Sequence, residues 1–199
     1  MVYLRPVFLS HLSYQTAAVN LPPLLRKLLP FLLAFVLPLV LSYAWWGGFN
    51  AVVIEPASGG PYTYAYLEQK GDYAKLPDLA GEVHAALLAQ KIEPGLPINV
   101  LYSNPEVVDV GERVARTGYL IPEGVAVKHS LAVDRIPARQ VLRARLQASP
   151  LLAPSRVYLA LDRHQQARGR GIRMPTVEIY RPTGSVWRMG ELTVEMDAP

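Results

Sequence analysis

The feature that most constrains the fold of this chain is an internal repeat in its C-terminal two thirds. Residues 96–102 (LPINVLY) recur 78 positions later as residues 174–180 (MPTVEIY), without a gap. At the same offset, the helix-like stretch 76–90 falls on 154–168. Two copies of a unit that cannot bury its apolar face alone predict one domain with a pseudo-two-fold axis and a groove along that axis.

The two copies differ at a position that bears on function. At this offset Val100 of the first copy corresponds to Glu178 of the second. A carboxylate on a short central strand costs free energy unless it is paired. Glu178 is therefore the first candidate for a functional residue.

The pattern along the chain predicts the same secondary structure twice. Residues 62–69 alternate, with Tyr62, Tyr64, Tyr66 and Glu68 on one face, as in a strand. Apolar residues recur at helical spacing in 76–90 and 154–168, and the remaining strands are expected at 98–102, 113–121, 138–146, 176–180 and 187–194. The order β-α-β-β, found twice, predicts an α+β domain: an antiparallel sheet with two helices on one face.

The N-terminal part of the chain has the composition of a membrane anchor. No residue from Leu28 to Ile54 is charged, and residues 28–46 are about as long as a helix that crosses roughly 30 Å of hydrocarbon. Tyr43, Trp45 and Trp46 lie at the far end, as expected at a membrane interface. We expect an uncleaved transmembrane helix over 28–46, kinked by Pro38. A cleaved signal peptide would need a shorter apolar core and small residues at its end, and a buried helix would rarely be uncharged for so long.

Charge placement suggests the orientation and the domain boundaries. Arg5, Arg26 and Lys27 are the only basic residues before Glu55, so the positive-inside rule places the arm 1–27 in the cytoplasm. The C-terminal domain would then be extracytoplasmic, in the periplasm if this is a bacterial inner-membrane protein. The Gly- and Pro-rich residues 47–61 are expected to form a linker, followed by a domain over 62–196.

Composition excludes several classes of function. The region from Glu55 onward carries 17 of the 20 basic residues and all 16 acidic residues, so it lacks the concentrated positive charge of a nucleic-acid-binding protein. There is no cysteine, and the four histidines lack metal-ligand spacing. We therefore expect no metal site, no cofactor and no nucleic-acid partner.

Three short motifs in order resemble the GyrI-like small-molecule-binding domain, also known as the AraC-type effector-binding domain. They are residues 69–73 (QKGDY) after the first strand, 101–105 (LYSNP) at a strand and turn, and 175–180 (PTVEIY), which matches the pattern Pro-x-x-Glu-x-Tyr. The similarity covers about residues 62–195. It implies a ligand pocket, and in multidrug-sensing regulators of this family the late Glu attracts planar cations at the base of an aromatic pocket.

The position that matches the late Glu is Glu178. The side chains expected to form the aromatic walls are Tyr64, Tyr66, Tyr102, Tyr180 and Trp187. A ligand cation would pair with the carboxylate, and the aromatic rings would add cation–π attraction. The expected function is therefore a membrane-anchored module, and not an enzyme, that binds a cationic or amphipathic small molecule.

Two other interpretations remain open at the level of the sequence. Glu178 could pair with an internal arginine such as Arg143 while the tyrosines fill the core, which would make the domain a scaffold for a protein partner. Some relatives hydrolyse electrophiles with a Glu and a Tyr or Trp, so Glu178 could also serve as a general base.

Overall fold

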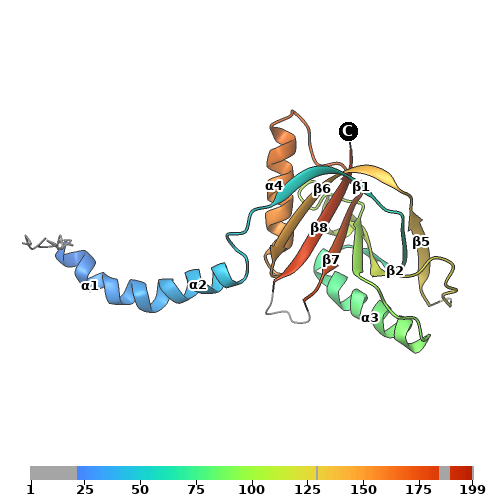
Figure 1. Cartoon of the computed structure of the whole chain (residues 1–199), viewed down its shortest axis with the longest axis horizontal. Helices are drawn as coiled ribbons and strands as arrows, with labels where there is room; N and C mark the ends of the chain where they lie inside the picture. The colour runs from blue at the N-terminus through green and yellow to red at the C-terminus, as the bar shows by residue number, and fades with distance from the viewer. Residues whose placement is uncertain (1–21, 129, 184–188, 199) are drawn as a thin grey trace, which may run out of the picture. The chain divides into compact units, whose positions relative to one another are not determined.

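The structure is a computed structural model that describes residues 22–128, 130–183 and 189–198 (Figure 1). The chain divides into two compact units, one ending at Leu41 and the other beginning at Ser42. Most of the expected N-terminal arm, residues 1–21, lies outside the described residues.

The N-terminal unit is helical. Helix α1 (Pro23–Phe31) continues through a π-helical turn (Leu32–Val36) into α2 (Leu37–Trp45), whose last residues belong to the second unit. The backbone N–H of Leu37 bonds to the carbonyl of Leu32, one residue further back than in an α-helix. The wider turn comes just before Pro38, whose ring and missing N–H disturb the preceding turn. Residues Arg26–Trp45 are long and apolar enough to cross a membrane, judged by length and composition.

The second unit is built on an antiparallel sheet of eight strands. The strands are β1 (Val53–Gly59), β2 (Tyr62–Lys70), β3 (Pro97–Leu101), β4 (Val114–Leu120), β5 (Ala132–Ile136), β6 (Arg139–Ala148), β7 (Thr176–Arg181) and β8 (Gly190–Asp197). Their order across the sheet is β1-β6-β8-β7-β3-β4-β2-β5. Two helices, α3 (Leu76–Ala89) and α4 (Ala153–Gln166), complete the unit (Figure 1). Short 3-10 turns lie at Tyr73–Lys75 and Val110–Glu112.

The duplicated architecture predicted from the sequence is confirmed. Strand β2, α3, β3 and β4 form one β-α-β-β copy, and β6, α4, β7 and β8 form the other. The order β6-β8-β7 on one side mirrors β2-β4-β3 on the other, so the two copies meet at the pair β3–β7. The protein is of the α+β class.

The prediction that residues 47–61 form a linker is wrong for much of that range. Residues 53–59 form β1, which pairs with β6 at one end of the sheet, and the unpredicted β5 pairs with β2 at the other. Pro56 and Gly59 give this segment the composition of a loop, but an edge strand tolerates a proline because one side of it needs no partner. The globular unit thus begins well before Tyr62.

Both helices cover the same face of the sheet, called here the helix face. Val83 and Leu87 of α3 pack with Ala65 of β2, and Val157 and Leu161 of α4 pack with residues of β6 and β8. The other side is called the open face, and there Tyr64, Ile98, Val100 and Val177 form a separate apolar cluster. Cross-strand partners share a face, so the sheet register decides which side each functional candidate occupies.

The register corrects the comparison of Val100 with Glu178. Across β3 and β7, Asn99 lies opposite Glu178, and Val100 lies opposite Val177. Successive residues of a strand point to opposite faces, so Val100 and Glu178 lie on opposite faces of the sheet. Equivalent residues of the two copies should share a face, so the gapless offset of 78 is wrong by one residue in these strands. Asn99 and Glu178 share the helix face, whereas Val100 belongs to the open face.

Candidate functional site

A cavity lies on the helix face between the N-terminal parts of α3 and α4, over the central strands β3 and β7. Its volume is about 590 Å³. Most of its lining is apolar or aromatic, and the residues used in the argument below are Tyr73, Leu76, Leu101, Tyr158, Leu159 and Glu178. The groove expected along the axis relating the two copies is thus present as a cavity.

Glu178 forms part of the floor of this cavity. Its position on a central strand leaves it only 9% exposed. The amide Nδ2 of Asn99, from the neighbouring strand, donates to Oε2 of Glu178 at 3.1 Å. The hydroxyl of Thr117 on β4 donates to Oδ1 of Asn99 at 2.7 Å, which orients the amide so that its N–H groups face the carboxylate.

Burial dominates the electrostatics of Glu178. Desolvation raises the pKa of the carboxyl above its ordinary value, and hydrogen bonds from Asn99 and Tyr158 only partly lower it. The hydroxyl of Tyr158 also lies 2.8 Å from Oγ1 of Thr176. Burial, and secondarily the charge of Glu178, raise the pKa of Tyr158 well above its ordinary value, so its hydroxyl stays protonated and can donate.

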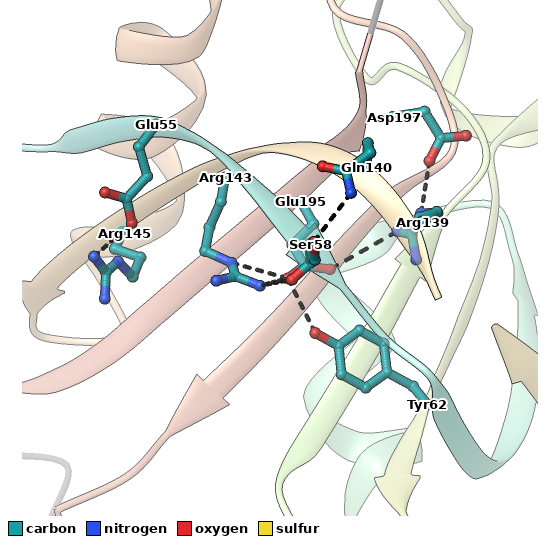
Figure 2. Close-up of polar contacts among 9 residues, drawn as sticks. All are labelled: Glu55, Ser58, Tyr62, Arg139, Gln140, Arg143, Arg145, Glu195 and Asp197. Atoms are coloured by element: carbon teal, nitrogen blue, oxygen red, sulfur yellow. Dashed lines mark hydrogen bonds and ion pairs between the residues drawn. The ribbon is translucent and has the colours of Figure 1, made fainter. Parts of the chain in front are cut away.

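Among the described residues, no lysine, arginine or histidine forms an ion pair with Glu178. The interpretation that Arg143 neutralises it is wrong, because Arg143 lies on the open face. There its Nε and Nη2 donate to Oε1 of Glu195 at 3.0 and 2.8 Å (Figure 2). Glu178 is therefore a buried carboxylate held by neutral hydrogen-bond donors.

The open face has its own polar cluster, which ties β1 to the sheet (Figure 2). Glu195, whose side chain is 1% exposed, also accepts a hydrogen bond of 3.0 Å from the hydroxyl of Tyr62. Arg143 donates from Nη2 to the carbonyl of Ser58 on β1 at 2.7 Å. Because Arg143 and Oε1 of Glu195 bond to each other and to groups of β1 and β2, we assign the cluster a structural role.

Three of the tyrosines predicted to line the Glu178 pocket gather elsewhere. Arg116 lies over the rings of Tyr66 and Tyr102, with its Cζ 4.6 and 5.1 Å from their centroids, and the rings of Tyr64 and Tyr66 are 5.3 Å apart. The strand register places Tyr64 and Tyr66 on the open face. The expectation that these three rings line the groove above Glu178 is therefore wrong, and the cation they surround belongs to the protein itself.

The other two predicted wall residues have different outcomes. Tyr180 is on the helix face two residues after Glu178, but it packs against the core beneath α4 and does not line the cavity. Trp187 lies outside the described residues.

The sequence analysis missed two aromatic residues that do line the cavity, Tyr73 and Tyr158. The hydroxyl of Tyr73 is directed at the carbonyls of Ser103 and Val114, at 3.0 and 2.8 Å, which fixes its ring at the wall. Tyr73 ends the first GyrI-like motif, residues 69–73, so that motif could have indicated it. Tyr158 sits within the amphipathic pattern of α4, where nothing local distinguishes a cavity residue from a core residue.

In the part of the chain that the structure describes, no cluster of three or more His, Asp or Glu side chains could hold a metal ion. The polar groups available at the cavity are the buried carboxylate of Glu178, the exposed carboxylate of Glu106, two phenols, an amide and the hydroxyl of Ser155, among apolar side chains. Such a set can bind an organic cation or a neutral apolar molecule.

Comparison with known proteins gives a likeness in structure only. No family model matches the chain, and no curated protein matches it. Among solved structures, the EcmrR–DNA complex in EcmrR-RPo matches with a TM-score of 0.56 and 11% identity, over 86% of this chain and 67% of that chain. The EcmrR C-terminal domain alone matches with a TM-score of 0.54 and 13% identity, over 73% of this chain and 96% of the domain.

The chain shares its fold with the EcmrR C-terminal domain. This likeness fits the GyrI-like effector-binding fold that the sequence motifs predict, and at these identities it concerns the fold alone. A hydrolase of Listeria innocua matches more weakly, with a TM-score of 0.49 and 12% identity over 77% of this chain and 96% of the hydrolase.

Proposed function

We propose that the globular unit binds a cationic, partly apolar small molecule in the cavity between α3 and α4, with Glu178 as its counter-ion. The observation that carries the proposal is a buried carboxylate with no cationic partner in the described chain, on the floor of a cavity of about 590 Å³. Cavities that bind small molecules commonly measure about 300–1,000 Å³.

The electrostatic argument supports a cation over a neutral ligand. Burial alone makes the ionised form of Glu178 costly, and this is the main cause of its raised pKa. A positive charge placed beside the carboxylate would offset that cost in the bound state. The rings of Tyr73 and Tyr158 line the same cavity and would add cation–π attraction and apolar contact.

We further propose that the protein is a single-pass membrane protein anchored by residues Arg26–Trp45. The basic residues Arg26 and Lys27 at the start of this helix, with Glu55 after its end, favour a cytoplasmic N-terminus and an extracytoplasmic globular unit. The module would then sample ligands on the outer side of a membrane, with the bilayer as its second partner.

The proposal is for binding without turnover. A general base would also suit the raised pKa of Glu178, and that alternative predicts product formation abolished by Glu178→Gln. A filled pocket and a Glu178 carboxylate paired with an arginine would favour a scaffold for a protein partner. The open cavity and the pairing of Arg143 with Glu195 favour a ligand.

The test uses the full chain in phosphatidylcholine nanodiscs and two ligands with the same ring system. In mildly alkaline buffer 9-aminoacridine is a cation and acridine is neutral. Calorimetric titration, corrected with empty nanodiscs, should show about tenfold tighter binding of the cation, equivalent to about 1.4 kcal/mol. Glu178→Gln should abolish that preference.

Glu106→Gln is the matched control, because Glu106 is an exposed carboxylate at the same cavity and its loss should leave most of the preference intact. Equal affinity for the two acridines, or no binding by well-folded protein, would refute the cation pocket. Release of a modified ligand by the wild type, but not by Glu178→Gln, would replace the binding module by an enzyme.

A further inference from the structure

Exposed apolar side chains gather where the chain leaves α2. Phe49 is 68% exposed and Leu151 is 80% exposed, and Trp45, the last residue of α2, is also exposed. The backbone N–H of Ser149 donates to the carbonyl of Trp46 at 2.9 Å, which places Leu151 two residues from that contact. Sδ of the exposed Met189 accepts a hydrogen bond from Nδ2 of Asn50 at 3.4 Å, so a third segment of the chain reaches the same place.

The segment 46–50 is bonded to the globular unit and does not behave as a free linker. Arg156 on α4 donates from Nη1 to the carbonyl of Gly47 at 2.8 Å and from Nη2 to the carbonyl of Asn50 at 2.7 Å. The side chain of Asn50 donates in turn to the carbonyl of Gln147, at the end of β6, at 2.7 Å.

Gly47 shows how closely this segment packs against the end of β6. Its φ of +76° lies in the left-handed region, and a Cβ there would come within 2.6 Å of the carbonyl oxygen of Gln147. A glycine just after a helix in this conformation ends the helix and turns the chain. The turn after α2 is therefore both sharp and pressed against β6.

The short distance along the chain from α2 to Gly47 points to the bilayer as the partner of the exposed apolar side chains. Gly47 follows the end of α2 by two residues, which span at most about 7 Å. The polar headgroup region on each side of a bilayer is about 5–8 Å thick. If α2 crosses the membrane, the groups bonded to Gly47 lie at headgroup level, whatever direction the rest of the unit takes.

The local composition suits that level. No residue between Leu28 and Ile54 is charged, so the uncharged stretch extends past the helix end and includes Phe49. Aromatic side chains such as Tyr43, Trp45 and Phe49 are favoured at the membrane interface. In water, by contrast, this group of exposed apolar side chains on one end of a folded unit would be unfavourable.

We propose that Trp45, Phe49, Leu151 and Met189 form a lipid-contact surface that seats the globular unit on the bilayer, and that Arg156 braces this surface against the end of α2. The inference rests on the membrane-anchoring part of the proposed function and is independent of the ligand. Its consequence is that this end of the globular unit, with the start of α4, lies at the membrane surface.

The absence of cysteine makes the test direct, because single-cysteine variants of the full chain carry one label each. Leu151→Cys, Val133→Cys and Leu39→Cys would be labelled with bimane in phosphatidylcholine vesicles containing a lipid with a shallow doxyl quencher, or one with a deep quencher. Leu151 reports the proposed surface. Val133 is the matched exposed control on β5, and Leu39 reports the anchor itself.

We expect the shallow quencher to reduce the fluorescence at position 151 by about half, with almost no change at position 133, and the deep quencher to act on position 39. Quenching at 39 with position 151 behaving like 133 would overturn the surface and leave the anchor standing. No quenching at 39 or 151 would overturn both, and the acridine titration would still decide the ligand pocket separately.

A second pair of variants tests the bracing role of Arg156. Arg156→Ala removes the two hydrogen bonds to the segment 46–50, so quenching at position 151 should weaken while quenching at position 39 stays the same. Arg163→Ala, an exposed arginine on the same helix, is the control and should change neither. Unchanged quenching at position 151 in Arg156→Ala would refute the bracing role.

Discussion

Asn99 lies directly opposite Glu178 across the central pair of strands and donates a hydrogen bond of 3.1 Å to its buried carboxylate. The two residues come from the two copies of the duplicated unit, at the place where the copies meet. One copy thus supplies the charged group and the other supplies a neutral donor that orients it. The sheet leaves the charge of Glu178 uncompensated, and this residual cost is what a ligand can relieve.

Replacing Glu178 by glutamine should stabilise the ligand-free protein. Because the folded state raises the pKa of Glu178 above 4.5, folding favours the protonated carboxyl. That contribution to stability is complete below the unfolded-state pKa and is lost as the pH rises through the raised folded-state pKa. At neutral pH the variant should gain about 1–3 kcal/mol, the usual scale for burying a polar group whose desolvation is not fully compensated.

The measurement is the thermal midpoint of the full chain in detergent, for wild type and Glu178→Gln, across the acidic to neutral range. The difference should be near zero at low pH and should grow as the pH rises, with Glu106→Gln following the wild type. A difference that does not depend on pH would contradict a raised pKa at this position.

The sequence was sufficient to predict the duplicated β-α-β-β plan, because the repeat and the helical periodicity act locally. It was not sufficient for β1 or β5. Val53–Gly59 contains a proline and ends in glycine, and it becomes a strand only because β6 offers it a partner. The edges of this sheet therefore depend on tertiary pairing that local propensity does not encode.

The same limit explains the mixed outcome for the candidate site. Alternation correctly places Tyr62, Tyr64 and Tyr66 on one face, but both faces of this sheet bury residues, so alternation cannot tell which face meets the helices. Glu178 could be singled out because a carboxylate is unexpected on a central strand. Tyr158 could not, because a tyrosine is ordinary on an amphipathic helix.

The pair of Arg143 and Glu195 should be much more important for stability than the neighbouring pair of Arg145 and Glu55. Arg143→Met leaves the buried carboxylate of Glu195 without its main cation and should cost about 3–5 kcal/mol. Arg145→Met breaks a pair whose side chains are both 42% exposed and should cost less than about 1 kcal/mol. Chemical denaturation of the three proteins compares these costs directly.

The double variant Arg143→Met/Glu195→Met provides the control for this comparison. Removing both charges should recover much of the loss caused by Arg143→Met, because no buried charge is then left unpaired. A double variant as unstable as the single one would show that packing around Glu195, and not its charge, accounts for the effect.

Two glycine-to-alanine substitutions should have opposite effects. At Gly118 a Cβ would collide with the backbone carbonyl of Ala65 and come within 2.8 Å of the Cα of Tyr66, on the paired strand β2. Neither atom can move without disturbing the sheet, so Gly118→Ala should cost about 2–4 kcal/mol. At Gly81, inside α3, a Cβ meets nothing within 4 Å, so Gly81→Ala should stabilise by about 0.5–1 kcal/mol.

Both glycine variants can be followed by denaturant midpoint in the same buffer. If Gly118→Ala is tolerated, the close approach of β4 to β2 is absent in solution. If Gly81→Ala destabilises, α3 is not the regular, exposed helix that the structure shows at this position.

Tyr158→Phe should shift the pH dependence of ligand binding. The hydrogen bond of the Tyr158 hydroxyl lowers the pKa of Glu178, so its removal should raise that pKa further. A cationic ligand pairs with the ionised carboxylate, and its affinity falls as the pH drops through the pKa of Glu178. The midpoint of 9-aminoacridine affinity against pH should therefore move upward in Tyr158→Phe.

Tyr180→Phe, which removes a phenol on the same face but outside the cavity, should leave the midpoint where it is in the wild type. A uniform loss of affinity at every pH would mean that Tyr158 contacts the ligand itself and does not act through Glu178.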